Sequence, residues 1–487
     1  MNHSIRLYNS DLAPAADRRW GTYSIASIWF ACLHNMGVYT AAAGFFLLGV
    51  PIWQVLIGIF LGLLLTWAGA ELMGRFGFRE GVPLPVAARV GFGVFGANIP
   101  ALVRGGAAVA WYGIQTFLAS HAVQILVLLL VPSAKALDHG HGFLGLSPLG
   151  WLCFLFIWGV QLFIAEHGME AIRKTQNWAG AVVSIVMISL AVGLTAKAGF
   201  HLDYGDHTAS GFSSGAAGAI VKIGTLLFVV YATMILNFCD FTRFSPTRRS
   251  YFWGNFFGLP VSGMVFAVTV LLLTGASYKL AGKALTEPTD FLQLTHNRWL
   301  VGIGAVLFIF ATLGVNIIAN LVSPAFDLAN VNPARITFRR GALIASAVCV
   351  VVMPWKLFAS PVAINYFLGS LGAMLGPMFG VIVADYYLLQ RQRVDVDGLY
   401  STDRTGPYFY SRGFNWRAIA AALIGVAVSV PLAVVPDFAA WSWVAWYAGT
   451  AAAAISHVVL TKTLPGGTRV SPSTPSPASA GLDIARG

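Results

Sequence analysis

Residues 98–130 read NIPALVRGGAAVAWYGIQTFLASHAVQILVLLL, and stretches of this kind decide the fold class. A transmembrane helix needs about 20 mostly apolar residues, so this stretch is long enough to cross a bilayer. It nevertheless contains Gln115, and a second apolar stretch contains Asn320. An amide in hydrocarbon is costly unless it has a partner. Trp111 precedes Gln115 by four residues and shares its helix face. An aromatic plane beside two amides predicts a site for a flat, hydrogen-bonding ring.

Composition excludes a single water-soluble core. Of 487 residues, 57% are hydrophobic and 10% are charged, whereas a soluble domain carries about 25% charged residues. The net charge of +11 is spread over many short loops, so we expect no nucleic-acid partner. Four cysteines lie in apolar segments and are expected to pack as small hydrophobic side chains, not as disulfides or metal ligands. They are Cys32, Cys153, Cys239 and Cys349.

The apolar runs predict an all-α polytopic membrane protein with twelve transmembrane helices. Connections between the runs are short, and residues 390–415 form the one long polar loop. The predicted spans are 23–48, 52–73, 98–130, 148–166, 178–199, 217–238, 252–278, 299–323, 340–355, 362–389, 416–436 and 440–461.

The distribution of Lys and Arg predicts the orientation. If the N-terminus is cytoplasmic, 22 Lys and Arg residues fall in inner segments and only six in outer ones. The outer six are Lys135, Lys197, Lys279, Lys283, Arg298 and Lys356. Positive charge concentrates on the cytoplasmic side of membrane proteins. We therefore expect a multi-pass protein of the cell (inner) membrane, monomeric, with both termini in the cytoplasm.

The first predicted span contains His34 and Asn35 beside Gly37. Such residues in the middle of a span favour a local break in the helix, which frees backbone groups near the membrane midplane, where transporters bind solutes and ions. The alternative is that His34 and Asn35 only form hydrogen bonds between helices. Other ionisable residues lie mostly near span ends, where we expect their charged groups to reach the interface. They are Glu71, Arg104, Lys222, Asp240, Asp327 and Asp385.

An ordered set of motifs across residues 11–420 resembles the nucleobase–cation symporter family, most closely its hydantoin permease branch. The motif that enters the third span is Gly81-Val-Pro83-Leu-Pro85-Val-Ala-Ala-Arg89, followed by Phe92-Gly93 and Phe95-Gly96. The other matching stretches are Arg19-Trp-Gly-Thr-Tyr-Ser, Trp111-Tyr-Gly-Ile-Gln115-Thr, Ala319-Asn320-Leu-Val-Ser323-Pro324-Ala, Met353-Pro354-Trp355, Gly376-Pro377, Asp385-Tyr386 and Arg412-Gly413-Phe-Asn-Trp416.

The resemblance implies a leucine-transporter-type fold, with two inverted repeats of five helices followed by two extra helices. Its first and sixth helices are broken beside the solute and cation sites. The implied divisions are a cytoplasmic segment (1–22), a first repeat (23–199), a second repeat (217–389), a cytoplasmic loop (390–415), two extra helices (416–461) and a tail (462–487). The tail is rich in Ser, Pro and Gly and is expected to be disordered.

The resemblance also implies the substrate-binding residues. Trp111 matches the family's aromatic plane, Gln115 its amide partner and Asn320 the second amide. At the remaining three positions, the residue type either differs from that of the hydantoin permease or is apolar. Asn35 stands where the hydantoin permease has Gln, Tyr231 stands where it has Trp, and Leu368 matches an apolar position that closes over the substrate.

The implied cation site departs from the sodium-coupled permease. Two adjacent hydroxyl side chains ligate the ion there, whereas this chain has Gly314 and Val315. The remaining candidates are carbonyls around Ala31, His34 and Ala311, with Thr312 nearby on another face. His34 can titrate near neutral pH, or it can be structural. The cation is therefore H⁺ or Na⁺, with H⁺ favoured, and no other cofactor is expected.

These observations predict a secondary active transporter that imports a uracil-, allantoin- or hydantoin-like ring with a cation, by alternating access. The alternatives are a cation-independent facilitator, or a transporter of cytosine, a purine or thiamine. A channel needs a repeated pore filter, and a membrane enzyme needs clustered metal or acid–base residues. The sequence shows neither, and it has no phosphate-binding Gly-Lys-Ser/Thr motif.

Overall fold

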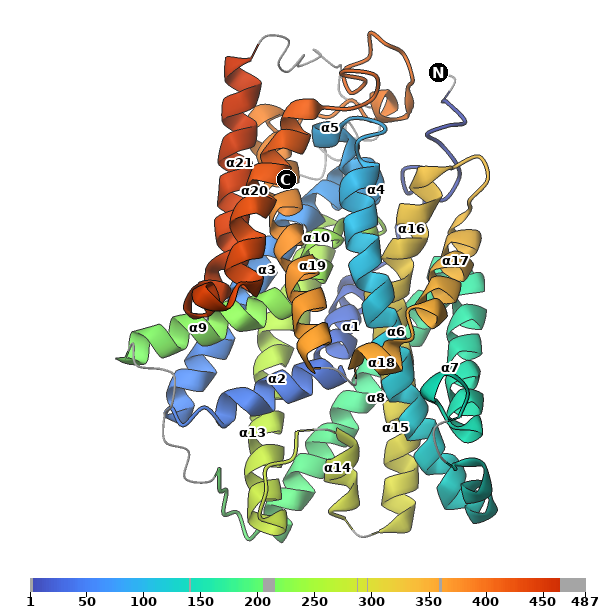
Figure 1. Cartoon of the computed structure of the whole chain (residues 1–487), viewed down its shortest axis with the longest axis vertical. Helices are drawn as coiled ribbons and strands as arrows, with labels where there is room; N and C mark the ends of the chain where they lie inside the picture. Colours follow the sequence, from blue (N-terminus) through green and yellow to red (C-terminus); the bar gives the residue numbers. More distant parts are fainter. Residues whose placement is uncertain are drawn as a thin grey trace.

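The computed structural model describes residues 3–139, 142–204, 215–286, 288–295, 297–358 and 361–464. Within these ranges the chain is helical apart from loops and one isolated bridge between Ser411 and Phe414. Most long helices run along the long axis of the molecule, whereas α2 and α9 lie across it (Figure 1). The first helices are α1 (Thr22–Leu33), α2 (Met36–Phe46), α3 (Ile52–Glu80), α4 (Leu84–Ala87), α5 (Arg89–Phe92), α6 (Asn98–Leu130), η1 (Pro132–Leu137), η2 (Phe143–Gly145), α7 (Pro148–Glu166) and α8 (Gly168–Lys197).

The second half contains three short π-helices, which are η3, η4 and η5. Its elements are α9 (Gly215–Val230), α10 (Ala232–Leu236), α11 (Cys239–Thr242), α12 (Arg248–Phe256), η3 (Phe257–Val261), α13 (Ser262–Ala281), α14 (Pro288–Gln293), α15 (Arg298–Asn316), η4 (Ile317–Leu321), α16 (Val322–Val331), α17 (Phe338–Val351), α18 (Pro354–Phe358), α19 (Pro361–Ala384), η5 (Asp385–Leu389), η6 (Asp397–Tyr400), α20 (Trp416–Val434), η7 (Pro436–Val444) and α21 (Ala445–Thr463).

Nine helices of the described ranges are long and apolar enough to cross a membrane. The first and sixth predicted spans are pairs of shorter helices, and the predicted span 340–355 corresponds to α17, which has 14 residues. Twelve crossings therefore stay a prediction. The helix that corresponds to the fifth predicted span, 178–199, begins ten residues earlier, because α8 runs from Gly168 to Lys197. Its polar first turns are helical, and Arg173 donates to both carboxylate oxygens of Glu170.

The predicted break in the first helix is confirmed. α1 ends at Leu33, and α2 begins at Met36 after two non-helical residues. Asn35 has an extended backbone, and its Oδ1 accepts a hydrogen bond of 2.8 Å from the Gly37 N–H, which caps α2. The sixth helix is broken as well, because α9 and α10 are separated by Tyr231.

Glycine residues allow the closest helix crossings. A methyl group at Gly62 of α3 would lie 2.5 Å from the carbonyl oxygen of Gly224 in α9. Likewise, a methyl group at Gly258 would lie 2.7 Å from the Cα atom of Ala26, which brings η3 against α1. Small residues are the usual means of close helix packing in membranes.

The N-terminal segment packs against the end of the bundle that also carries the 390–415 loop (Figure 1). Leu7, Leu12 and Trp20 are buried. The Tyr400 hydroxyl donates to the Leu12 carbonyl at 2.7 Å, and Ser4 N–H donates to the Tyr400 carbonyl at 3.0 Å. The predicted loop is therefore an ordered part of this face. The predicted disordered tail, beyond residue 464, lies outside the described residues.

Candidate functional site

Trp111 lies against the break in the first helix. A methyl group on Gly37 would lie 4.0 Å from the Trp111 ring and 3.3 Å from Oδ1 of Asn35. Trp111 and Asn35 are 76 positions apart in sequence, and the structure brings both beside Gly37 at the start of α2. The Trp111 side chain is half-buried, so part of its ring is free of protein contacts.

Asn320 is held by a buried amide network between α15 and α6. Its Nδ2 donates to Oδ1 of Asn316 at 2.9 Å. The Nδ2 of Asn316 in turn lies within hydrogen-bonding distance of Oε1 of Gln161 (2.8 Å), Oγ1 of Thr116 (3.0 Å) and the Tyr112 carbonyl (3.0 Å). The bond to Asn316 uses one of the two Nδ2 hydrogens of Asn320, which leaves the other hydrogen and the Oδ1 atom for a ligand.

The hydrogen bonds of neighbouring residues show which part of α6 lies beside Asn320. Arg104 donates from Nη2 to the Ala319 carbonyl at 2.9 Å, whereas Asn316 bonds Tyr112 and Thr116, farther along α6. Asn320 follows Ala319 and its side chain bonds back to Asn316, so it lies beside the part of α6 from Arg104 to Thr116, which carries Trp111. It belongs to η4, and short π-helical segments are frequent at functional sites.

Two further predicted residues present polar atoms without partners. Within the part of the chain that the structure describes, Oε1 of Gln115 and the hydroxyl of Tyr231 are buried and have no hydrogen bond. Tyr231 occupies the break between α9 and α10 and packs edge-on against Trp29 of α1, with ring centroids 5.8 Å apart. Buried polar atoms are nearly always bonded, so these two unpaired atoms point to a missing ligand or water.

The sixth predicted substrate residue is Leu368. Its backbone lies on α19, and its side chain falls outside the described residues. α19 packs against α6 and α10, the helices that carry or follow the other predicted residues.

The predicted cation residues surround the junction of α1, α8 and α15. The Ala31 carbonyl accepts a hydrogen bond from the His34 N–H at 3.0 Å, and Thr312 and Val315 are buried on α15. The side chain of Ala311 lies outside the described residues. Both ring nitrogens of His34 have partners, at 2.7 Å from the Tyr39 hydroxyl and 2.9 Å from the Ser184 hydroxyl. This geometry agrees with the structural alternative for His34.

Gln176 of α8 fills the space beside Gly314. A methyl group on Gly314 would lie 2.9 Å from Oε1 of Gln176. The Gln176 side chain is buried, its Nε2 donates to the Ser27 carbonyl of α1 at 3.1 Å, and its Oε1 has no partner among the described residues. Sequence reasoning missed this residue, because only the fold shows that α8 faces position 314.

Four ionisable side chains that were expected at the membrane interface are buried, and one of them, Arg104, bonds the residue before Asn320. Arg104, Asp240, Asp327 and Asp385 have 0–1% exposed surface, so their predicted contact with the interface is wrong. The carboxylate of Asp240 accepts from the Leu84 N–H at 2.7 Å, and that of Asp327 accepts from the Ser323 hydroxyl at 3.4 Å. Arg104, seven residues before Trp111 in the same apolar stretch, was the available signal in the sequence.

Comparisons with known proteins agree with this architecture. Residues 13–449 match the family described as permease for cytosine/purines, uracil, thiamine, allantoin. An allantoin permease of Bacillus subtilis is 37% identical over 470 residues, covering 95% of this chain and 94% of the relative. A purine-uracil permease of Arabidopsis thaliana is 32% identical over 439 residues, covering 87% of this chain and 71% of the relative.

Among solved structures, the nucleobase-cation-symport-1 transporter Mhp1, in a closed conformation with bromovinylhydantoin bound, matches with a TM-score of 0.76. The two chains are 24% identical, and the match covers 96% of this chain and 98% of that one. The similarity establishes a leucine-transporter-type polytopic fold.

Proposed function

The chain belongs to the family of permeases for cytosine/purines, uracil, thiamine and allantoin, and on this basis we propose that it imports an allantoin-like ring across the cell membrane. Membership makes it an integral membrane transporter that works by alternating access, and not an enzyme. Uracil and hydantoins are the alternative substrates of the same chemical class. The 37% identical allantoin permease supports naming the ureide first.

The observation that carries the proposal is that Gln115, one helical turn from the half-buried Trp111, and Tyr231, at the break between α9 and α10, keep buried polar atoms without partners among the described residues. A flat ring stacked on Trp111 at the α1 break would have the Asn35 amide next to it. Oε1 of Gln115 accepts hydrogen bonds only, so it suits a ring N–H, whereas the Tyr231 hydroxyl can donate to a ring carbonyl. Uracil, allantoin and hydantoin all alternate N–H and C=O groups around their rings.

Orientation is part of the proposal. The N-terminal segment and the loop 390–415 share one face of the molecule, and both are rich in Arg. Placing this face in the cytoplasm agrees with the 22 inner and six outer basic residues. We propose a monomer of the inner membrane with both termini inside.

For coupling, we propose that protons rather than sodium drive uptake. Sodium prefers several oxygen ligands, as hard cations do. Position 314 has no side chain, Val315 is apolar, and the Ala31 carbonyl already accepts a hydrogen bond. Oε1 of Gln176 occupies the space next to Gly314. A protein group therefore fills the space beside position 314, which supports the absence of a sodium site.

The direct test is a panel of allantoin, uracil, hydantoin and cytosine in a thermal-shift measurement on purified protein, with and without sodium. Allantoin should raise the Tm most, and omitting sodium should leave that shift unchanged. A panel in which only cytosine or a purine raises the Tm would contradict the substrate proposal. Saturable, competed uptake into proteoliposomes distinguishes the carrier from a channel.

A further inference from the structure

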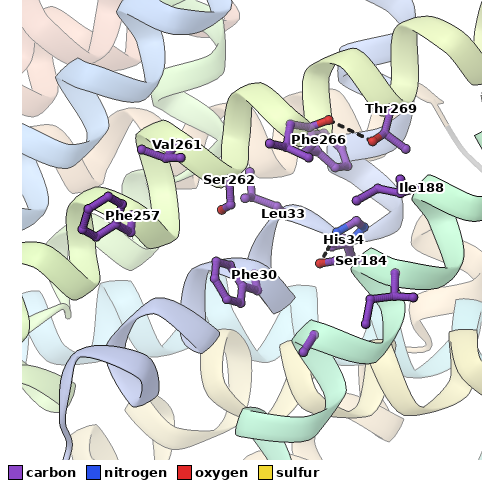
Figure 2. A pocket seen from close by; sticks show the side chains of 13 residues that line it. Phe30, Leu33, His34, Ser184, Ile188, Phe257, Val261, Ser262, Phe266 and Thr269 are labelled. Carbon is purple, nitrogen blue, oxygen red and sulfur yellow. Dashed lines mark hydrogen bonds between the residues drawn. The ribbon is translucent and has the colours of Figure 1, made fainter.

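A cavity of about 420 Å³ lies between α1, α8 and the η3–α13 helix (Figure 2). The end of α1 contributes Phe30, Leu33 and His34, and α13 contributes Phe266 and Thr269. In Figure 2 the labelled side chains come from all three helices and point toward one another across this space. The cavity shares none of the predicted substrate residues, although His34 is the neighbour of Asn35.

The cavity exists because these helices touch and then diverge. Methyl groups on Gly254 and Gly258 would lie 2.6 Å and 2.7 Å from atoms of α1, so the helices are in close contact there. The next residues of this wall, Val261 and Ser262, already line the cavity. α1 ends at Leu33, so no further turn of it fills the gap.

Every polar side chain in the lining already has a hydrogen bond within the protein. His34 is bonded to Tyr39 and Ser184, and Ser184 also donates to the Gly180 carbonyl at 2.8 Å. The hydroxyls of Ser262 and Thr269 donate to the carbonyls of Gly258 and Val265, one helical turn earlier. Each of these hydroxyls already uses its one donor hydrogen within the protein, and the remaining lining is aliphatic or aromatic. The lining therefore favours an apolar occupant.

The cavity is continuous with the surface that faces the membrane. Its rim residues are largely exposed on long apolar helices, with exposed fractions of 65% for Ile185, 48% for Phe257 and 49% for Val265. From Phe257 to Thr269 the wall extends about 18 Å at about 1.5 Å per residue, slightly more than half of the roughly 30 Å hydrocarbon core. We propose that this cavity binds one acyl chain of a membrane phospholipid, packed against Phe30, Leu33 and the His34 ring.

The test uses a photoreactive lipid. The full-length protein is reconstituted in vesicles of phosphatidylethanolamine and phosphatidylglycerol that contain a phospholipid with a diazirine on its acyl chain. After irradiation, adducts are mapped by mass spectrometry. They should concentrate on the segments 30–34 and 261–269. Adducts spread evenly over the exposed faces of α3, α7 and α20 would overturn the proposal.

Variants give a second, independent readout. Ala181→Phe on α8 and Val265→Trp on the opposite wall should each reduce labelling of these segments at least five-fold, since their side chains would fill the cavity. Val192→Phe and Val268→Trp are matched controls on the same two helices, exposed but outside the lining, and should leave labelling unchanged. The site is refuted if the cavity-filling and control variants are labelled equally while all of them elute from gel filtration as the wild type does.

Discussion

Trp111 carries the stacking surface of the proposed substrate site, and its replacement by alanine removes that surface. Stacking of a ring on an aromatic side chain contributes about 1–3 kcal/mol, or roughly a 5- to 150-fold change in affinity. We expect Trp111→Ala to weaken substrate affinity by this factor while the protein still inserts. Trp178→Ala is the matched control, because Trp178 is 76% exposed on α8. Competition uptake measures both, and unchanged affinity in Trp111→Ala would remove this ring from the site.

Gln115 and Gln161 differ in a way that separates binding from stability. Oε1 of Gln115 has no described partner, whereas Gln161 bonds Asn316 and Thr116. Removing an unsatisfied buried amide costs little, but removing one partner of a bonded pair costs about 1–3 kcal/mol. Gln115→Leu should therefore keep the Tm and lose substrate affinity and selectivity, while Gln161→Leu should lower the Tm. A reduced Tm with wild-type selectivity in Gln115→Leu would make that amide structural.

At the residue scale, the sequence indicates which side chains are unusual but not what they bond. The amides at 115 and 320 and the aromatic at 111 are conspicuous in apolar spans, so motif and hydropathy together identify them. That Asn316 bonds Gln161, and that Gln176 faces Gly314, depends on which helices are neighbours. Such contacts join residues far apart in the chain, and one sequence contains no signal for them.

At the element scale, two glycine-to-alanine substitutions should change stability in opposite directions, one at the crossing of α3 and α9 and one on α7. Gly62→Ala places a methyl group 2.5 Å from the Gly224 carbonyl, so it should destabilise the protein by about 1–3 kcal/mol through overpacking. At Gly159 of α7 nothing lies within 4 Å of the added methyl. Gly159→Ala should therefore stabilise by about 0.4–1 kcal/mol, since alanine loses less backbone entropy. Thermal unfolding in one detergent compares them, and equal effects would contradict the close crossing.

The helix breaks show how far local patterns determine elements. His34 and Asn35 in an apolar run predict the first break, because Asn is a good N-cap and the residues are poor in hydrocarbon. The spacing Gly58-x-x-x-Gly62 similarly signals a close crossing. The π-helices are different. η4 carries Asn320, whose partner Asn316 is fixed by α6 and α7, so its geometry depends on tertiary packing.

At the scale of the whole molecule, Arg89 joins three separate parts of the chain. Its guanidinium donates to the Leu7 carbonyl (2.8 Å), the Leu399 carbonyl (2.9 Å) and Oδ1 of Asn330 (2.6 Å). Lysine keeps the charge but cannot reproduce this planar fork. Because a hydrogen bond to a charged group contributes about 1.5–3 kcal/mol, Arg89→Lys should lower stability by about that amount. It should also speed proteolysis of the N-terminal segment. Arg6→Lys, an exposed site, is the control.

The driving ion is a property of the whole molecule. In the wild type, the α1–α8–α15 junction offers no hydroxyl at positions 314 and 315. Replacing sodium by choline at constant pH should therefore change the initial uptake rate little, whereas collapsing the proton gradient should reduce accumulation. Steep, saturable stimulation by sodium would contradict proton coupling and mean that backbone carbonyls complete an ion shell.

A designed gain of sodium dependence tests the same junction from the other direction. Gly314→Ser alone should misfold or lose activity, because its Cβ would lie 2.9 Å from Oε1 of Gln176. Adding Gln176→Ala removes the nearer obstruction, so that only the Cβ of Ala179, at 3.0 Å, must shift slightly. Position 314 then carries a hydroxyl, and Val315→Thr adds a second. Each oxygen strengthens the binding of a hard cation, so the triple variant should show several-fold stimulation of uptake by sodium over choline. Gln176→Ala by itself, which adds no ligand, is the matched control. If it gained the same stimulation, the amide and not the missing hydroxyls would be what excludes sodium.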